Sequence, residues 1–127
     1  MVKRQGFTLI ELMVVLVIIG GITALAVPNL MTLQASWERR LAVEDTLNQI
    51  SRLGAWTRSH HQVVTINANT IEPNAALELP EGLRVTADEP ITWLDNGICL
   101  GGEVVLHHEE TTRRFELEPP FCQPSAL

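Results

Sequence analysis

The stretch Lys3 to Val27, KRQGFTLIELMVVLVIIGGITALAV, contains one carboxylate, Glu11, inside an apolar run that begins directly after Gly6. As a helix, the run from Phe7 to Val27 spans roughly 31 Å, close to the ~30 Å hydrocarbon thickness of a bilayer. We therefore expect a membrane-spanning helix over residues 7–29. A carboxylate near the middle of such a helix costs about 2.5 to 3.5 kcal/mol, and less near an end, so we expect Glu11 to have a partner.

Two ordinary explanations of this run are a secretory signal peptide and a simple single-span anchor. A signal peptide needs a short apolar core followed by a small-residue cleavage site, but this run is long and ends at Pro28-Asn29-Leu30. A simple anchor explains the length and the preceding Lys3 and Arg4. It leaves the carboxylate within the apolar run unexplained.

The string KRQGFTLIELMVV resembles the class III signal of type IV prepilins and of the pseudopilins of type II secretion. The resemblance implies that a membrane-embedded prepilin peptidase cuts between Gly6 and Phe7, removing a leader of residues 1–6, and that the new Phe7 amine is N-methylated. That amine would pair with Glu11 of a neighbouring subunit, and a charge pair is stronger in low dielectric although desolvation cancels part of the gain. Gly6, without a Cβ, suits an extended backbone in a tight protease cleft.

Charge predicts how the chain sits in the membrane. Lys3 and Arg4 precede the span, and positive residues stay cytoplasmic, so residues 30–127 are expected to form an exported, periplasmic head on a single-pass protein of the bacterial inner membrane. The chain has 9 Lys and Arg against 15 Asp and Glu. This acidic balance argues against wrapping a nucleic acid backbone.

The helical pattern continues past the apolar run. Leu30, Leu33, Trp37 and Leu41 recur at helical spacing, and further apolar residues predict a helix that reaches about residue 60. Within it, Gly20, Gly21 and Pro28 are the positions where a bend or local melting is predicted, because glycine and proline weaken a helix. The resemblance implies loss of helix there on assembly, and a gentle kink without a role is the alternative.

Beyond Gln62 the sequence changes to short alternating runs, which predict strands of an antiparallel sheet. The helical stripe from Leu41 to Trp56 is expected to cover its apolar face, giving an α+β fold. The end of the chain, residues 118–127, is expected to be coil tied down by Cys122. The predicted strands are QVVTIN (62–67), LELP (77–80), LRVT (83–86), ITWL (91–94), EVVLHH (103–108) and RRFELE (113–118).

The two cysteines, Cys99 and Cys122, lie in the part expected to be exported, where an oxidising compartment permits a disulfide. Their bridge would close a loop of about 24 residues and stabilise the fold by about 3.4 kcal/mol in the chain-entropy model. A metal site is the alternative use of two cysteines, but the sequence has no CxxC spacing.

The second half, with LGAWTRSHHQVVTIN and ITWLDNGICLGGEVVLHHEETTRRFEL, resembles the H-type minor pseudopilins and their pilus relatives. The cysteine pair and the Pro-rich end resemble pilins more than pseudopilins. The aspartate loop of the calcium-binding major pseudopilin is absent from the sequence, so a minor subunit is expected.

Other chemistry receives little support. His60-His61 and His107-His108 are adjacent pairs whose side chains point to opposite faces of a strand, so solvated histidines are expected rather than a metal site. Asp95-Asn96-Gly97 is expected to be a turn. No catalytic nucleophile arrangement or cofactor site is predicted. The three tryptophans, Trp37, Trp56 and Trp93, are expected in the core.

These observations predict a minor pseudopilin or minor pilin that supports protein export from a type II secretion pseudopilus. The predicted partners are the prepilin peptidase and methyltransferase, other pilins or pseudopilins in a filament, and an inner-membrane assembly platform. The alternative is a minor type IV pilin acting in pilus priming, adhesion or DNA uptake. A basic, flexible tail would favour DNA uptake, but no Lys or Arg follows Arg114.

Overall fold

The structure is a computed structural model that describes Lys3 and residues 5–127. It divides into two compact units, Met1–Glu38 and Arg39–Leu127, each of which is described by itself. Three residues of the predicted leader, Met1, Val2 and Arg4, lie outside the described residues. The chain is an α+β protein, with a long apolar helix at its start and antiparallel strands in its second half.

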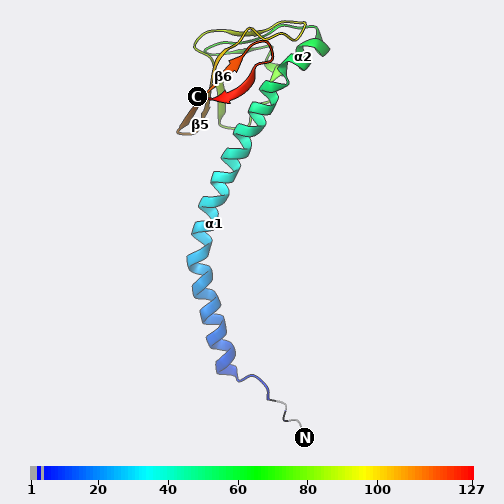
Figure 1. Cartoon of the computed structure of the whole chain (residues 1–127). Coiled ribbons are helices and arrows are strands. Elements are labelled where there is room, and N and C mark those ends of the chain that lie inside the picture. Colours follow the sequence, from blue (N-terminus) through cyan, green and yellow to red (C-terminus); the bar gives the residue numbers. More distant parts are fainter. Residues whose placement is uncertain (1–2, 4) are drawn as a thin grey trace. The chain divides into compact units, whose positions relative to one another are not determined.

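The helix predicted to reach about residue 60 is divided in two. Helix α1 runs Leu9–Ser51 and α2 runs Leu53–His60, so the prediction of one helix was wrong at Arg52 (Figure 1). There the Arg52 N–H donates to the Gln49 carbonyl at 3.1 Å, the shorter i to i+3 bond that tightens a helix end. Helix α2 ends at His60, and the next residue, His61, has a φ of 52°, the left-handed conformation common after a helix.

Helix α1 is continuous through Gly20, Gly21 and Pro28 in the isolated chain. Beside Pro28, the Thr32 hydroxyl donates to the Pro28 carbonyl at 2.8 Å. The predicted loss of helix at these positions on assembly stays a prediction for the filament.

The strands form two antiparallel sheets, in the orders β2-β1-β4 and β3-β5-β6-β7. The long β5–β6 hairpin is the centre of the larger sheet. A short 3-10 helix, η1 (Asn74–Ala76), follows β2. The strand bounds are β1 Val64–Ile66, β2 Ile71–Glu72, β3 Leu83–Thr86, β4 Ile91–Trp93, β5 Gly102–His108, β6 Thr111–Glu118 and β7 Gln123–Ala126.

Two predictions for the second half were wrong. The segment 77–80 is not a strand, because both backbone groups of Glu78 bind the side chain of Gln49 instead of a neighbouring strand. The end of the chain is not coil, because β7 pairs with β6 from Gln123 to Ala126. The disulfide at Cys122 holds this segment beside β6, where its backbone can complete the ladder.

The core of the second unit lies where the strands meet the last turns of α1 and the start of α2. Val43, Ile50 and Leu53 supply its helical side, and Trp93 is its largest fully buried side chain. The predicted stripe was displaced at its start, since Leu41 is 60% exposed. Trp37 is 59% exposed, so its prediction as a core residue was wrong, while the half-buried Trp56 stacks on His60.

Candidate functional site

The apolar half of α1 has no protein cover within the first unit. Every described residue from Gln5 to Glu38 is exposed, including all the large aliphatic side chains of the run. The helix is long and apolar enough to cross a membrane by length and composition. Exposed apolar surface on this scale requires lipid or a partner protein, because its contact with water is unfavourable in free energy.

Glu11 takes part in a helix cap through its backbone N–H. Thr8 precedes α1, and its hydroxyl accepts a hydrogen bond from the Glu11 N–H at 3.3 Å. Thr8-Leu9-Ile10-Glu11 therefore has the spacing of a capping box, in which a Thr caps the helix and a Glu stands three residues later. The negative charge of Glu11 also lies in the first turn, where it complements the helix dipole. The T-x-x-E spacing could have revealed this cap from sequence.

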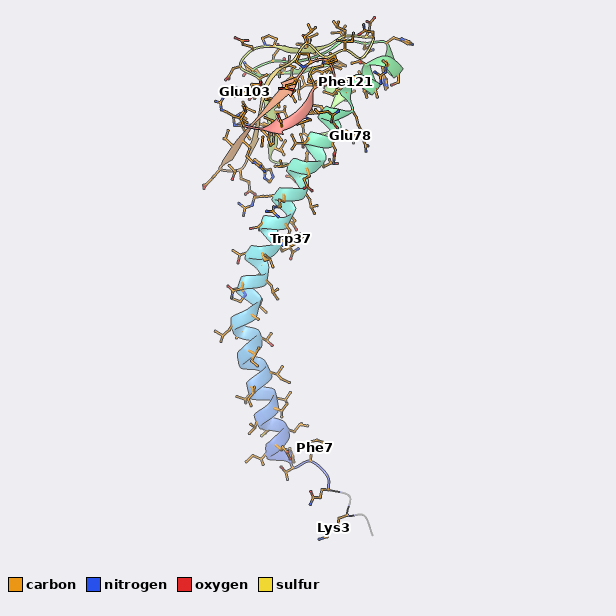
Figure 2. The ribbon with its side chains drawn as sticks, viewed as in Figure 1. Lys3, Phe7, Trp37, Glu78, Glu103 and Phe121 are labelled. Atoms are coloured by element: carbon orange, nitrogen blue, oxygen red, sulfur yellow. A yellow bond between two sulfur atoms is a disulfide. The ribbon has the colours of Figure 1, made fainter. Side chains whose placement is uncertain are left out.

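The predicted cleavage site is accessible. Phe7 is 86% exposed at the start of α1 (Figure 2), and it lines a small hollow of about 180 Å³ with Gln5, Gly6 and Glu11. A Cβ added at Gly6 would meet no atom within 4 Å. The fold of the chain therefore does not require glycine at this position, and a requirement for it would come from a processing enzyme.

The predicted disulfide is present. Cys99 and Cys122 are both fully buried, and their sulfurs are bonded across a Cα–Cα distance of 5.9 Å. The Cys99 N–H also donates to the Pro120 carbonyl at 2.9 Å, so a backbone hydrogen bond joins the same two segments as the disulfide. The bridge fixes the start of β7 against the centre of the second unit.

Comparison with known proteins agrees with the N-terminal pattern. The family described as prokaryotic N-terminal methylation motif matches residues 1–27. The chain is 38% identical over 96 residues to type II secretion system core protein G of Escherichia coli (strain K12), covering 68% of this chain and 66% of the relative. It is 33% identical over 90 residues to the protein of the same name from Klebsiella pneumoniae, covering 65% of this chain and 64% of that relative.

The chain belongs to the type IV pilin and pseudopilin family. It spans no more than 66% of the length of these two relatives. No solved structure matches. The names of the relatives do not distinguish a minor from a major pseudopilin, so the H-type resemblance and the minor role stay predictions.

The remaining candidate residues, all in the described part of the chain, do not form a reactive centre. Within the described residues, no three His, Cys, Asp or Glu side chains are grouped to hold a metal. His107 is half-buried and lies between the hydroxyls of Thr86 and Thr112, at 2.9 and 3.3 Å. Asn96 and Gly97 form the predicted turn, since the Ile98 N–H donates to Asn96 Oδ1 at 3.0 Å and Gly97 has a φ of 90°.

The charges on the outer face of the larger sheet are exposed. Glu103 accepts a hydrogen bond from Arg114, and this contact, together with the nearby charge of Asp88, raises the pKa of the Arg114 guanidinium. Glu103 also stands directly opposite Glu116 on the neighbouring strand, where like charges repel. Arg114 therefore offsets a local repulsion and does not mark a catalytic group.

Proposed function

We propose that this pseudopilin is a structural subunit, and not an enzyme, of a type II secretion pseudopilus. It would be stored in the bacterial inner membrane and built into a filament through α1, in support of protein export. The observation that carries the proposal is an apolar helix whose described residues are exposed from Leu9 to Glu38 and which has one carboxylate, Glu11, in its first turn. The similarity to proteins named type II secretion system core protein G supports the choice of machine.

The proposed order of events follows from charge. Lys3 and Arg4 hold the N-terminus in the cytoplasm, and α1 crosses the bilayer so that residues 30–127 reach the periplasm. A prepilin peptidase then cuts between Gly6 and Phe7, and a methyltransferase modifies the new amine. Before cleavage no positive amine exists at Phe7, so the charge of Glu11 is offset only by the helix dipole at the start of α1.

Assembly would supply the missing countercharge. In a filament, the methylated Phe7 amine of one subunit would approach Glu11 of the next, in surroundings that contain little water. A lone carboxylate is costly there, and pairing lowers that cost only when both partners are in place. The pair therefore favours the assembled subunit over the isolated one. Other pseudopilins and an inner-membrane assembly platform are the partners that this step requires.

The test separates processing from assembly in one strain. Glu11→Val, coexpressed with a prepilin peptidase and the other secretion components, should insert into the membrane and lose its first six residues, as intact mass would show. Its incorporation into sheared filaments should fall at least tenfold, the factor that corresponds to about 1.4 kcal/mol. Glu38→Val, which also removes an exposed carboxylate from α1, is the matched control and should assemble normally.

Two outcomes would contradict the proposal. A chain that stays unprocessed, or that is cut near Ala26, would exclude the leader and the family's route into the membrane. A Glu11→Val chain that is processed and assembles like the parent would exclude the charge pair.

The disulfide favours a second candidate, a minor type IV pilin, because the cysteine pair and the Pro-rich end resemble pilins. Deletion of the gene would separate the two. Loss of exported enzyme activity from the medium indicates a secretion pseudopilus, and loss of surface pili with normal secretion indicates a pilus.

A further inference from the structure

The second unit has a surface groove that neither the fold nor filament assembly explains. It has a volume of about 360 Å³, within the usual range for small binding pockets. Its walls come from the β1–β2 turn and η1 on one side and from β3 on the other. We call this the β2–β3 groove, and its lining residues are Ala68, Asn69, Thr70, Ile71, Asn74, Leu77, Leu79, Arg84, Val85 and Thr86.

One wall of the groove is an unpaired strand edge. Strand β3 is the outermost strand of the larger sheet, with β5 on its other side. The Leu83 N–H donates to the Pro80 carbonyl and the Ala87 N–H to the Asn67 carbonyl, so both point away from β5. Backbone groups of alternate residues in an antiparallel strand point to the same side. The N–H and C=O of Val85, midway between these two, therefore face the groove.

The hydrogen bonds at the far edge of the sheet lead to the same assignment. The Leu127 N–H donates to the Arg114 carbonyl, so even-numbered residues of β6 bond β7 and odd-numbered ones bond β5. Leu106 stands opposite Arg113, an odd-numbered residue of β6, so the backbone of Leu106 is hydrogen-bonded to β6. The residues on either side of Leu106 in β5 are therefore hydrogen-bonded to β3. Val85 stands opposite Leu106 and so has no ladder bond to β5. Outside the strand ladders, no backbone hydrogen bond joins its N–H or C=O to another residue within 5–127.

The other wall is also an unpaired edge. The Asn67 N–H donates to the Thr70 carbonyl at 2.8 Å and closes the β1–β2 turn. The next pair, Ile66↔Ile71, is therefore a non-hydrogen-bonded pair, and the backbone groups of Ile71 point away from β1. Strand β2 is the outermost strand of its own sheet, and Ile71 lines the groove. The groove thus has backbone donors and acceptors on both sides.

The side chains of the groove define what it could hold. Leu77, Leu79 and Val85 are buried or half-buried and form an apolar floor. Arg84 is exposed on β3 and is the one charged residue among those that line the groove. It makes no ion pair with any described residue of the chain. The groove therefore combines apolar contact, backbone hydrogen bonding and a free positive charge.

We propose that the β2–β3 groove binds an extended segment of a partner protein in which apolar and acidic residues alternate. Such a segment would add as a strand beside Val85 and Ile71, as peptides add to the open edges of sheets. Because side chains of a strand alternate between faces, one set would rest on the apolar floor and the other would reach Arg84. This inference does not depend on the proposed filament.

A second copy of this chain is a poorer occupant. The outermost strand β7 of the larger sheet carries β6 beside it, so a second copy that docked through β7 would bring a whole sheet to the groove and not a single strand. The partner segment must therefore be free of its own sheet, as a tail or flexible loop of a different protein is.

The first test uses a defined peptide and the full chain in detergent micelles. The probe is the acetylated, amidated peptide Ser-Val-Glu-Val-Glu-Ser, and the matched peptide has Lys in place of Glu. Titration followed by ¹⁵N NMR should shift the amides of Ile71 and Val85 in a saturable way. The Glu peptide should bind at least tenfold more tightly than the Lys peptide, the factor expected for one charge-assisted contact.

Variants test each part of the proposal. Arg84→Glu should reverse the preference so that the Lys peptide binds better, whereas Arg52→Glu, an exposed arginine outside the groove, should keep the preference for Glu. A Glu peptide N-methylated at its central residues should lose binding, because it cannot donate to the strand edges. Hydrogen exchange of the free chain should be faster at Val85 than at Arg84 and Thr86, which bond β5.

Several results would overturn the proposal. Absence of a saturable shift at Val85 and Ile71 with the Glu peptide would exclude strand addition. Equal binding of the two peptides would exclude the role of Arg84. An amide of Val85 as protected as its neighbours in the free chain would show that the edge is already paired.

Discussion

Gln49 and Glu78 are joined by two hydrogen bonds of 2.8 Å, in which the Gln49 amide donates to the Glu78 carbonyl and accepts from the Glu78 N–H. One side chain of α1 thus replaces a neighbouring strand for the segment before β3. Each bond stabilises the fold by about 1 kcal/mol. Gln49→Ala should lower the free energy of unfolding of the second unit by about 1 to 3 kcal/mol, as measured by urea denaturation.

The control for this change is Asn48→Ala, the next residue on the same helix, which is exposed and makes no side-chain hydrogen bond with the described residues. It should leave the midpoint nearly unchanged. Equal stability of Gln49→Ala and the parent would show that water replaces the two bonds without loss.

Removal of the disulfide should destabilise the second unit without affecting membrane insertion. Cys99→Ser and Cys122→Ser each open a loop of about 24 residues, with an expected loss of about 3.4 kcal/mol in the chain-entropy model. The double variant should lose no more than either single one, because the same bridge is absent in all three. Reaction of the folded parent with a maleimide would contradict the bridge.

Gly54 and Gly21 should respond to alanine in opposite directions. A Cβ at Gly54 would lie 2.8 Å from the Gly97 carbonyl oxygen, so Gly54→Ala should cost about 1 to 3 kcal/mol although alanine favours helix. A Cβ at Gly21 would meet nothing within 4 Å, so Gly21→Ala should stabilise α1 by about 1 kcal/mol. Circular dichroism and thermal unfolding of the two variants would measure both effects.

If α1 must lose helix on assembly, the same Gly21→Ala change should also reduce incorporation into filaments while leaving processing at Gly6 intact. Normal incorporation would show that assembly does not require melting at this position. The readout is the ratio of filament to membrane protein in the same cells.

The cap at Thr8 can be tested apart from the charge of Glu11. Thr8→Val keeps the shape of the side chain but removes the acceptor for the Glu11 N–H, which should cost about 0.5 to 2 kcal/mol at the helix start. Hydrogen exchange at the Glu11 amide should rise while exchange in the middle of α1 stays the same. Unchanged exchange at Glu11 would mean that the hydroxyl does not cap the helix.

The strands that sequence predicted correctly are those with local signals. The segment 83–86 matches β3, and the central residues of β4, β5 and β6 lie in predicted strands, because β-branched or aromatic residues alternate there between turn residues. The two-residue strand β2 was too short for a pattern to appear. The α+β fold and the disulfide were confirmed, since both depend on features that are visible in the sequence.

What sequence could not predict depends on contacts between distant segments. Strand β7 contains Pro124 and no β-branched residue, and it forms because the disulfide places it beside β6. Leu77 and Leu79 alternate as in a strand, but the side chain of Gln49 forms hydrogen bonds with the backbone N–H and C=O of Glu78 between them. The groove beside Val85 also escaped prediction, since periodicity does not show which edge of a sheet is left open.

The bridge between Cys99 and Cys122 also determines how this subunit would carry load. Tension applied at Leu127 can peel β7 from β6 one hydrogen bond at a time, but only as far back as Cys122. There the covalent link passes the tension to Cys99, which pairs with the buried Trp93 of β4. Unravelling that starts at the last strand is therefore stopped before it reaches β6, and any further extension has to disrupt the packed centre of the unit.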